Sequence, residues 1–239
     1  MNICLFGGTF DPVHRGHLEV ARSAARKYKL QRVEFVVSDA PPHKYRQPIT
    51  PYLHRYAMVA LALAGEKAFY PSTLEAPEAG NGPARFRYSI ETVRRVKQSL
   101  KKSDRLFFLI GIDAFADIAT WREPEALLRE CEFIVVSRPG YRLPDVGRAL
   151  PLPLQPSPSV LKALGKAKGG EELVHAGLSI HLLDGVKVPV AASEIRKALA
   201  QGRSVERFVP RPVAEYIKKM KLYAGESQAV RLQSNVQDS

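Results

Sequence analysis

The sequence predicts an α/β fold in which helices cover both faces of a doubly wound parallel sheet. Short runs rich in β-branched and aromatic residues alternate with longer segments whose apolar residues recur at helical spacing. These short runs are apolar on both faces, which is typical of parallel strands buried between two helical layers. The chain has 239 residues, 45% of them hydrophobic, which is enough for one large core.

The first half of the chain gives strand, helix, strand, helix, strand and helix in turn. The expected spans are 3–6, 18–28, 33–37, 54–63, 68–70 and 90–100. In the first of these helices Leu18, Ala21 and Ala25 fall on one side. In the last, Ile90 and Val93 do the same. Both helices should therefore pack against a sheet.

The second half begins with the clearest strand of the chain, five consecutive apolar residues at 106–110. Further strands are expected at 133–136 and 178–183, and helices at 194–200 and 213–222. Pro210 and Pro212 precede or open the last helix, a position where proline is well tolerated.

Residues 142–172 interrupt this alternation. Five prolines punctuate the segment and Gly169-Gly170 lies near its end. We interpret it as an insertion or long loop within one domain that spans residues 1–223. Residues 224–239 are polar and aperiodic, and we expect a disordered tail there.

The charge balance suits an acidic partner. Lys and Arg number 36 against 24 Asp and Glu, a formal charge of +12, which fits nucleic acid, an anionic surface or a small phosphorylated substrate. No apolar run is long enough to predict a membrane span. The first residues lack the pattern of a signal peptide, and Cys4 and Cys131 lie in apolar runs as expected of buried thiols. A cytoplasmic location is expected.

The most informative segment is the turn after the first strand, which reads G-G-T-F-D-P-V-H-R-G-H from Gly7 to His17. In an open α/β sheet this is the carboxyl edge, where ligands bind. Gly7 and Gly8 let backbone N–H groups approach a phosphate, and the following helix N-terminus favours an anion. His14 and His17 are spaced to share one helix face. The segment predicts a phosphate site. A metal site is disfavoured because no third ligand stands at a suggestive spacing.

This segment resembles the G-G-T-F-D-P-x-H-x-G-H signature of bacterial nicotinate mononucleotide adenylyltransferases. The H-x-G-H part is shared by a whole nucleotidyltransferase superfamily, whereas G-G-T-F-D-P is more specific to the branch that makes pyridine dinucleotides. Further similar segments follow in the family's order: Pro41-Pro42-His43-Lys44, His54-Arg55-x-x-Met58, Tyr88 to Thr92, Gly111-Ile112-Asp113 with Trp121, and Ser137 to Tyr141. The resemblance spans most of 1–223 and implies a Rossmann-like nucleotidyltransferase domain.

The reaction implied by the resemblance is adenylyl transfer from ATP to nicotinic acid mononucleotide. It gives nicotinic acid adenine dinucleotide and pyrophosphate, in NAD biosynthesis, with Mg²⁺ bound alongside ATP. The phosphate of the mononucleotide is the nucleophile, so no protein nucleophile is needed. Catalysis would come from placing two anions in line and neutralising the developing charge.

The resemblance also implies roles for individual residues. His14 and His17 would contact the ATP phosphates, Lys44 would reach them from its loop, and Arg196 would hold the departing β and γ groups. The remaining ATP contacts would come from Gly7, Gly8, Thr9, Phe10, Gly111, Asp113 and Ser193. Trp121 would stack on the pyridine ring, while Tyr88 and Ser89 would meet the nicotinate carboxylate. Taken singly, Lys44 and Arg196 would be ordinary surface cations and Trp121 a core residue.

The chain departs from the family in the motif I-S-S-T-x-I-R, which here reads V-A-A-S-E-I-R from Val190 to Arg196. Two hydroxyls are missing. Ser193 remains, and its position also suits a helix N-cap. Backbone N–H groups at the helix start would still bind phosphate. We expect the change to affect ATP affinity rather than the class of reaction.

Two alternatives remain. One is a related nucleotidyltransferase that uses nicotinamide mononucleotide or another phosphorylated acceptor. The other is a basic nucleic-acid-binding protein without catalysis, which the charge favours. The intact His14, His17, Lys44 and Arg196, and the lack of an RNA-binding signature, argue against it. The sequence leaves open whether the chain forms a homo-oligomer, and gives no sign of a membrane partner.

Overall fold

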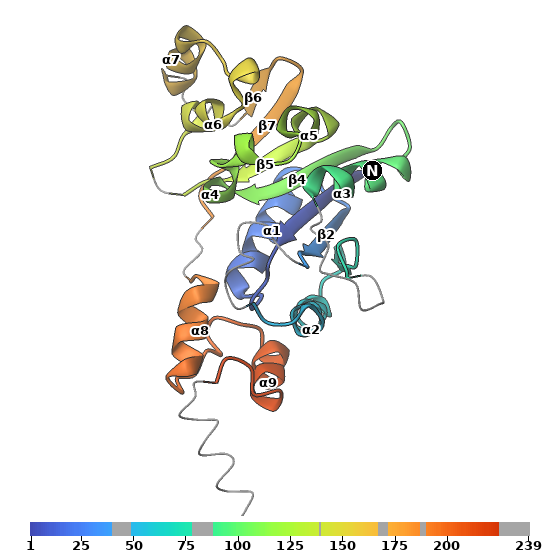
Figure 1. The fold of residues 1–239 in the computed structure, drawn as a ribbon, viewed down its shortest axis with the longest axis vertical. Coiled ribbons are helices and arrows are strands. Elements are labelled where there is room, and N and C mark those ends of the chain that lie inside the picture. Colours follow the sequence, from blue (N-terminus) through green and yellow to red (C-terminus); the bar gives the residue numbers. More distant parts are fainter. Residues whose placement is uncertain (40–48, 78–87, 139, 167–171, 187–189, 225–239) are drawn as a thin grey trace, which may run out of the picture.

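The computed structural model describes residues 1–39, 49–77, 88–138, 140–166, 172–186 and 190–224. Its sheet has seven strands in the order β3-β2-β1-β4-β5-β7-β6 (Figure 1). The strands are β1 Asn2–Gly8, β2 Arg32–Val37, β3 Phe69–Ser72, β4 Arg105–Gly111, β5 Glu132–Val136, β6 Glu172–His175 and β7 Leu178–Leu183. Neighbouring strands are parallel except β6, which pairs antiparallel with β7. The predicted doubly wound α/β fold is confirmed.

Helices connect these strands. They are α1 Arg15–Lys27, α2 Tyr52–Leu63, α3 Ser89–Gln98, α4 Ile112–Phe115, α5 Pro124–Glu130, α6 Leu143–Ala149, α7 Pro158–Lys166, α8 Ala192–Ala200 and α9 Arg211–Lys219. Two short 3₁₀ turns, η2 Ile118–Thr120 and η3 Leu152–Leu154, complete the described elements.

The sheet separates two apolar cores. Alternate side chains of β1 enter different cores, Cys4 and Phe6 on one face and Ile3 and Leu5 on the other. Helices α1, α2, α8 and α9 cover the first face, and α3, α4, α5 and α6 cover the second. Figure 1 shows α8 and α9 near the end of β1 from which α1 departs, with α6 and α7 at the far side of the sheet.

Each expected strand and helix is present, with bounds shifted by up to three residues. Helix α1, for example, begins at Arg15 rather than residue 18. The short helices α4 and α5 and the edge strand β6 were not predicted. In β6 only Leu173 is buried, so its sequence carries no apolar run.

Within 142–172 the described residues form α6, η3 and α7 and, at Glu172, the start of β6, so the long-loop interpretation is wrong for them. Pro144 lies in the first turn of α6 and Pro158 opens α7, positions where a missing N–H costs no hydrogen bond. Val146 and Leu154 are buried in the second core. Whether the segment is an insertion stays a prediction.

Cys4 and Cys131 are buried thiols without a disulfide, as expected, and burial raises the pKa of both. No helix in the described ranges is long and apolar enough to cross a bilayer. The tail expected at 224–239 lies, apart from Ala224, outside the described residues.

Candidate active site

The carboxyl end of β1 lies where the strand order reverses. Strands β2 and β3 follow on one side of β1, and β4 and β5 on the other. Ligands of open α/β sheets bind at such a switch point. Most of the predicted site residues lie at or after the end of β1 or of β4, while Tyr88 and Ser89 lie at the start of α3 and Ser193 and Arg196 lie on α8.

The turn after β1 is held in a strained conformation. Phe10 has a φ of +49°, in the left-handed region that side chains rarely adopt. Its ring is buried, edge-on to Phe6 at 5.5 Å and to His17 at 5.1 Å between centroids. A Cβ on Gly8 would lie 2.9 Å from this ring, so packing alone requires glycine there. The approach of phosphate to the two glycines stays a prediction.

His14 is the N-cap of α1 and His17 is the third residue of the helix, and their rings lie side by side as the spacing predicted. Their rings stack with centroids 3.7 Å apart and an angle of 26° between planes. The backbone N–H of His14 donates to Nδ1 of His17 at 3.2 Å. This contact assigns the proton of a neutral His17 ring to Nε2, which makes Nε2 a hydrogen-bond donor for an anion.

His14 is buried, with only 4% of its surface exposed. Its Nδ1 has no hydrogen-bond partner among the described residues. Burial lowers the pKa of His14 to about 4, so its ring is neutral at pH 7. A bound anion would favour the charged ring and raise this pKa. A buried, unpaired ring nitrogen at a helix start is therefore suited to a phosphate ligand.

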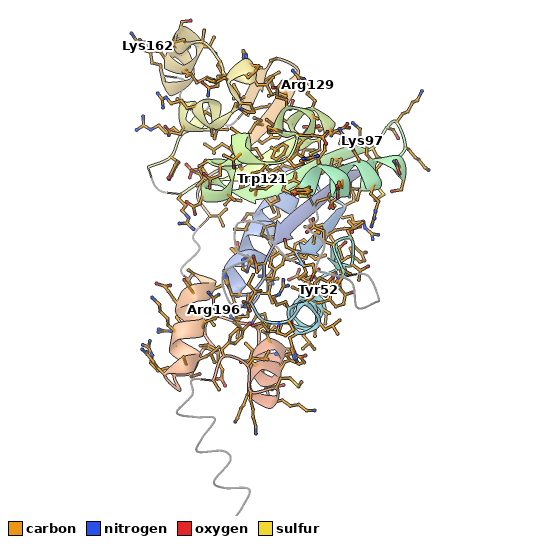
Figure 2. The ribbon with its side chains drawn as sticks, viewed as in Figure 1. Tyr52, Lys97, Trp121, Arg129, Lys162 and Arg196 are labelled. Atoms are coloured by element: carbon orange, nitrogen blue, oxygen red, sulfur yellow. The ribbon has the colours of Figure 1, made fainter. Side chains whose placement is uncertain are left out.

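Asp11 joins α8 to the turn. Nη1 of Arg196 donates to the backbone carbonyl of Asp11 at 2.7 Å. The Asp11 carboxylate accepts hydrogen bonds from the Tyr223 hydroxyl at 2.6 Å and from the Thr50 N–H at 3.3 Å. The structure thus brings Arg196 to the turn that carries the histidines, and Figure 2 shows it on α8 at this end of the molecule. Neither Asp11 nor Tyr223 had a role predicted from the sequence.

Ser193 is not the N-cap of α8. The cap is Ala191, and Ser193 is the second, exposed residue of the helix. The Glu194 carboxylate accepts a hydrogen bond from the Ala191 N–H at 3.2 Å. The helix therefore begins two residues earlier than it would with Ser193 as its N-cap. Glu194 also places a negative charge in the first turn. An anion bound there would meet some repulsion.

Two segments singled out by the resemblance meet after β4 and β5. Asp113 in α4 forms an ion pair with Arg138 at 2.7 Å, with side chains 52% and 65% exposed. A Cβ on Gly111 would meet no atom within 4 Å, so the space beside this glycine is open. Gly111 and Asp113 therefore border accessible space at the carboxyl end of β4.

Trp121 lies between the residues that follow β4 and the glycine turn that follows β1. It is partly buried and packs edge-on against Phe108, with centroids 6.3 Å apart. The Phe108 ring in turn lies 3.4 Å from where a Gly7 Cβ would stand. In Figure 2 Trp121 lies between α3 and α4. Its ring is thus one side chain away from the glycine turn.

The Tyr88-Ser89 segment lies beside the residue that follows Trp121. Tyr88 is the N-cap of α3 and Ser89 its first residue. The Arg122 guanidinium lies over the Tyr88 ring, 5.8 Å from its centroid. The structure therefore brings the three predicted nicotinate-binding residues to one region. Lys44 lies outside the described residues, so its predicted role cannot be placed.

The chain is similar to known nucleotidyltransferases. The model of the cytidylyltransferase-like family matches residues 5–198. A probable nicotinate-nucleotide adenylyltransferase of Citrifermentans bemidjiense is 36% identical over 224 residues, covering 93% of this chain and 98% of that protein. One from Solibacter usitatus is 36% identical over 225 residues, covering 93% of this chain and 100% of that protein.

Among solved structures, the Plasmodium falciparum nicotinic acid mononucleotide adenylyltransferase complexed with NaAD aligns with a TM-score of 0.66. The alignment covers 93% of this chain and 97% of that one, at 20% identity. At this identity the likeness supports the fold.

Proposed function

The chain belongs to the nicotinate-nucleotide adenylyltransferases, within the cytidylyltransferase-like family, and from this premise we propose that it transfers the adenylyl group of ATP to nicotinic acid mononucleotide. An oxygen of the mononucleotide phosphate attacks the α-phosphorus, and the bond to the β-phosphate oxygen breaks. Nicotinic acid adenine dinucleotide and pyrophosphate are released. The reaction takes place in the domain of residues 1–223, in the cytoplasm.

The observation that carries this proposal is the stacked pair formed by the buried His14 and the partly buried His17 beside the strained turn. The stacked rings of His14 and His17 stand at the N-terminus of α1, where the helix dipole also favours an anion. The Nε2–H of His17 donates to the α-phosphate, and this bond strengthens as charge develops in the transition state. His14 takes up positive charge only once the triphosphate is bound, since its burial disfavours the charged ring beforehand.

Arg196 and Lys44 neutralise the leaving pyrophosphate. Arg196 is already ordered by its hydrogen bond to the Asp11 carbonyl, so one of its terminal nitrogens is committed and the rest of its fork can bind the β and γ groups. Thr9, Gly111, Asp113 and Ser193 add contacts to ATP. The acceptor lies on the other side, with its pyridine ring on Trp121 and its carboxylate at Tyr88 and Ser89.

Mg²⁺ enters with ATP. In the described ranges no three His, Cys, Asp or Glu side chains form a group suited to a metal. Asp11 is hydrogen-bonded to Tyr223 and Thr50, and Asp113 is paired with Arg138. Phosphate oxygens of ATP and water would hold the ion, which is the environment that Mg²⁺ prefers, and it would neutralise part of the triphosphate charge.

The test is pyrophosphate release from ATP and Mg²⁺ with nicotinic acid mononucleotide, run beside the amide analogue. Release with a clear preference for the acid supports the proposal. Equal or better release with the amide would reassign the acceptor. No release with either would refute adenylyl transfer to a pyridine mononucleotide.

A further inference from the structure

Arg55, on α2, is a buried cation whose described hydrogen-bond partners are all backbone carbonyls. Only 1% of its surface is exposed. Nε donates to the Thr50 carbonyl at 2.7 Å, and Nη1 to those of Thr9 at 2.9 Å and Ser38 at 2.6 Å. Nη2 donates to the Asp39 carbonyl at 3.0 Å. One guanidinium thus ties together three segments at the ligand edge of the sheet.

Arg55 is linked to the turn after β1, residues Thr9 to Asp11, in two ways. The first is direct, through the Thr9 carbonyl. The second passes through Thr50, which accepts from Arg55 and donates its own N–H to the Asp11 carboxylate. The residue between Thr9 and Asp11 is Phe10, the one with a positive φ in this turn. Arg55 therefore holds both neighbours of the strained residue.

Burying a charged guanidinium costs free energy of folding. Arg55 therefore makes sense here only if the directions in which its N–H groups donate are needed. Burial lowers the pKa of the Arg55 guanidinium, although Asp11 and Asp39 favour its charge. A planar fork with five N–H donors reaches carbonyls in several directions at once, whereas a lysine ammonium donates from a single point. An apolar side chain could fill the volume but would leave four partly buried carbonyls without these bonds.

We propose that Arg55 is a positioning residue for adenylyl transfer. It fixes the turn from Thr9 to Asp11, and through it the start of α1, so that the His14 and His17 rings face the ATP phosphates. This inference rests on the proposed function. It assigns Arg55 no contact with substrate.

The test compares Arg55→Lys with Val59→Ala, a control on the same helix. Val59 is fully buried in the first core and has no hydrogen bond to the turn, so its truncation lowers the melting temperature without moving the histidines. For each folded protein we would measure kcat and the KM of each substrate. A displacement of about 1 Å can cost about 100-fold in rate.

The expected result for Arg55→Lys is a fall in kcat/KM for ATP of about 10- to 100-fold, with KM for the mononucleotide nearly unchanged. Val59→Ala should lower the melting temperature by a similar amount. Its kcat/KM for ATP and its KM for the mononucleotide should both stay near those of the wild type. A structural role alone would give the two variants the same kinetics per folded molecule. That outcome, or a rise in the KM of the mononucleotide as large as the fall in kcat/KM for ATP, would overturn the inference.

Two further measurements keep the test decisive. If Arg55→Lys does not fold, Arg55→Ala leaves room for a guanidinium ion, and dilute guanidinium chloride must restore turnover where ammonium chloride does not. Failure of this rescue would count against the inference. If wild type shows no turnover, the proposed function fails, and the inference is judged from ATP binding. Arg55→Lys must then bind ATP more weakly than Val59→Ala.

Discussion

The two sides of the ligand edge are built differently. On the β1 side, Asp11 and Arg55 are buried and hydrogen-bonded through their side chains, and the turn between Thr9 and Asp11 is strained at Phe10. On the β4 side, the Asp113–Arg138 pair is more than half exposed, and Trp121 is only partly buried. Buried polar groups with satisfied hydrogen bonds rigidify their surroundings, whereas exposed ion pairs contribute little.

This difference matches the two tasks of the proposed reaction. In-line attack at phosphorus depends on fixed donors, which the β1 side supplies before any ligand binds. The acceptor needs only an aromatic face and a few polar contacts, which the β4 side offers on partly exposed residues. Substitutions on the β1 side should therefore act on the chemical step, and those on the β4 side on acceptor affinity.

The largest effect is expected from His17→Ala. Loss of a donor aimed at transition-state charge typically lowers kcat by about 100- to 1000-fold. We would measure steady-state pyrophosphate release, with circular dichroism to verify the fold. His175→Ala, a histidine on the edge strand β6, is the matched control. Near-normal activity of the His17 variant would refute the role given to the histidine pair.

The next effect concerns His14 and pH. The pKa of His14 is lowered to about 4 in the folded protein, against 6.5 for an ordinary histidine. Between these pH values the unfolded chain binds the extra proton, so the free energy of unfolding falls as pH decreases through this window. His14→Asn should remove this dependence, a difference on the order of 3 kcal/mol between pH 7 and pH 4. The free energy of unfolding would be measured by urea unfolding as a function of pH for the wild type and for His14→Asn. Parallel curves for the two proteins would contradict the burial argument.

A smaller effect is expected from Trp121→Ala. Loss of stacking on a cationic ring should raise KM for the mononucleotide about tenfold, with KM for ATP little changed. Tyr70→Ala serves as the control, because Tyr70 is a partly exposed aromatic residue on β3 whose ring stacks with Arg32. Equal changes in both KM values would remove the distinction between the two sides.

The smallest effect is expected from Arg138→Gln. It breaks a pair whose side chains are both more than half exposed, so the free energy of unfolding should change by less than about 1 kcal/mol. Chemical denaturation measures this directly. A loss of several kcal/mol would mean that the β4 side is as tightly built as the β1 side.

Local patterns in the sequence predict much of this architecture. The strand at β4 follows from five consecutive apolar residues, and the side-by-side placement of His14 and His17 follows from helical spacing. Short or exposed elements such as β6 carry no such pattern. Two of the prolines that suggested a loop, Pro144 and Pro158, occupy the first turn of α6 and of α7 instead.

Contacts in the site between residues far apart in the sequence could not be predicted from local sequence patterns. Asp11 and Tyr223 are 212 positions apart, and only the folded chain brings them together. The bonds of Arg55 end on backbone carbonyls, which every residue possesses, so no residue type marks them. The role of Lys44 stays a prediction from the resemblance.

The most direct test of the two-sided site is the fluorescence of Trp121, which is the single tryptophan of the chain. The account predicts that nicotinic acid mononucleotide quenches its emission with saturable binding, while ATP with Mg²⁺ leaves it nearly unchanged. Quenching by ATP alone, or none by the mononucleotide, would contradict the placement of the acceptor on the β4 side and of the phosphates at β1.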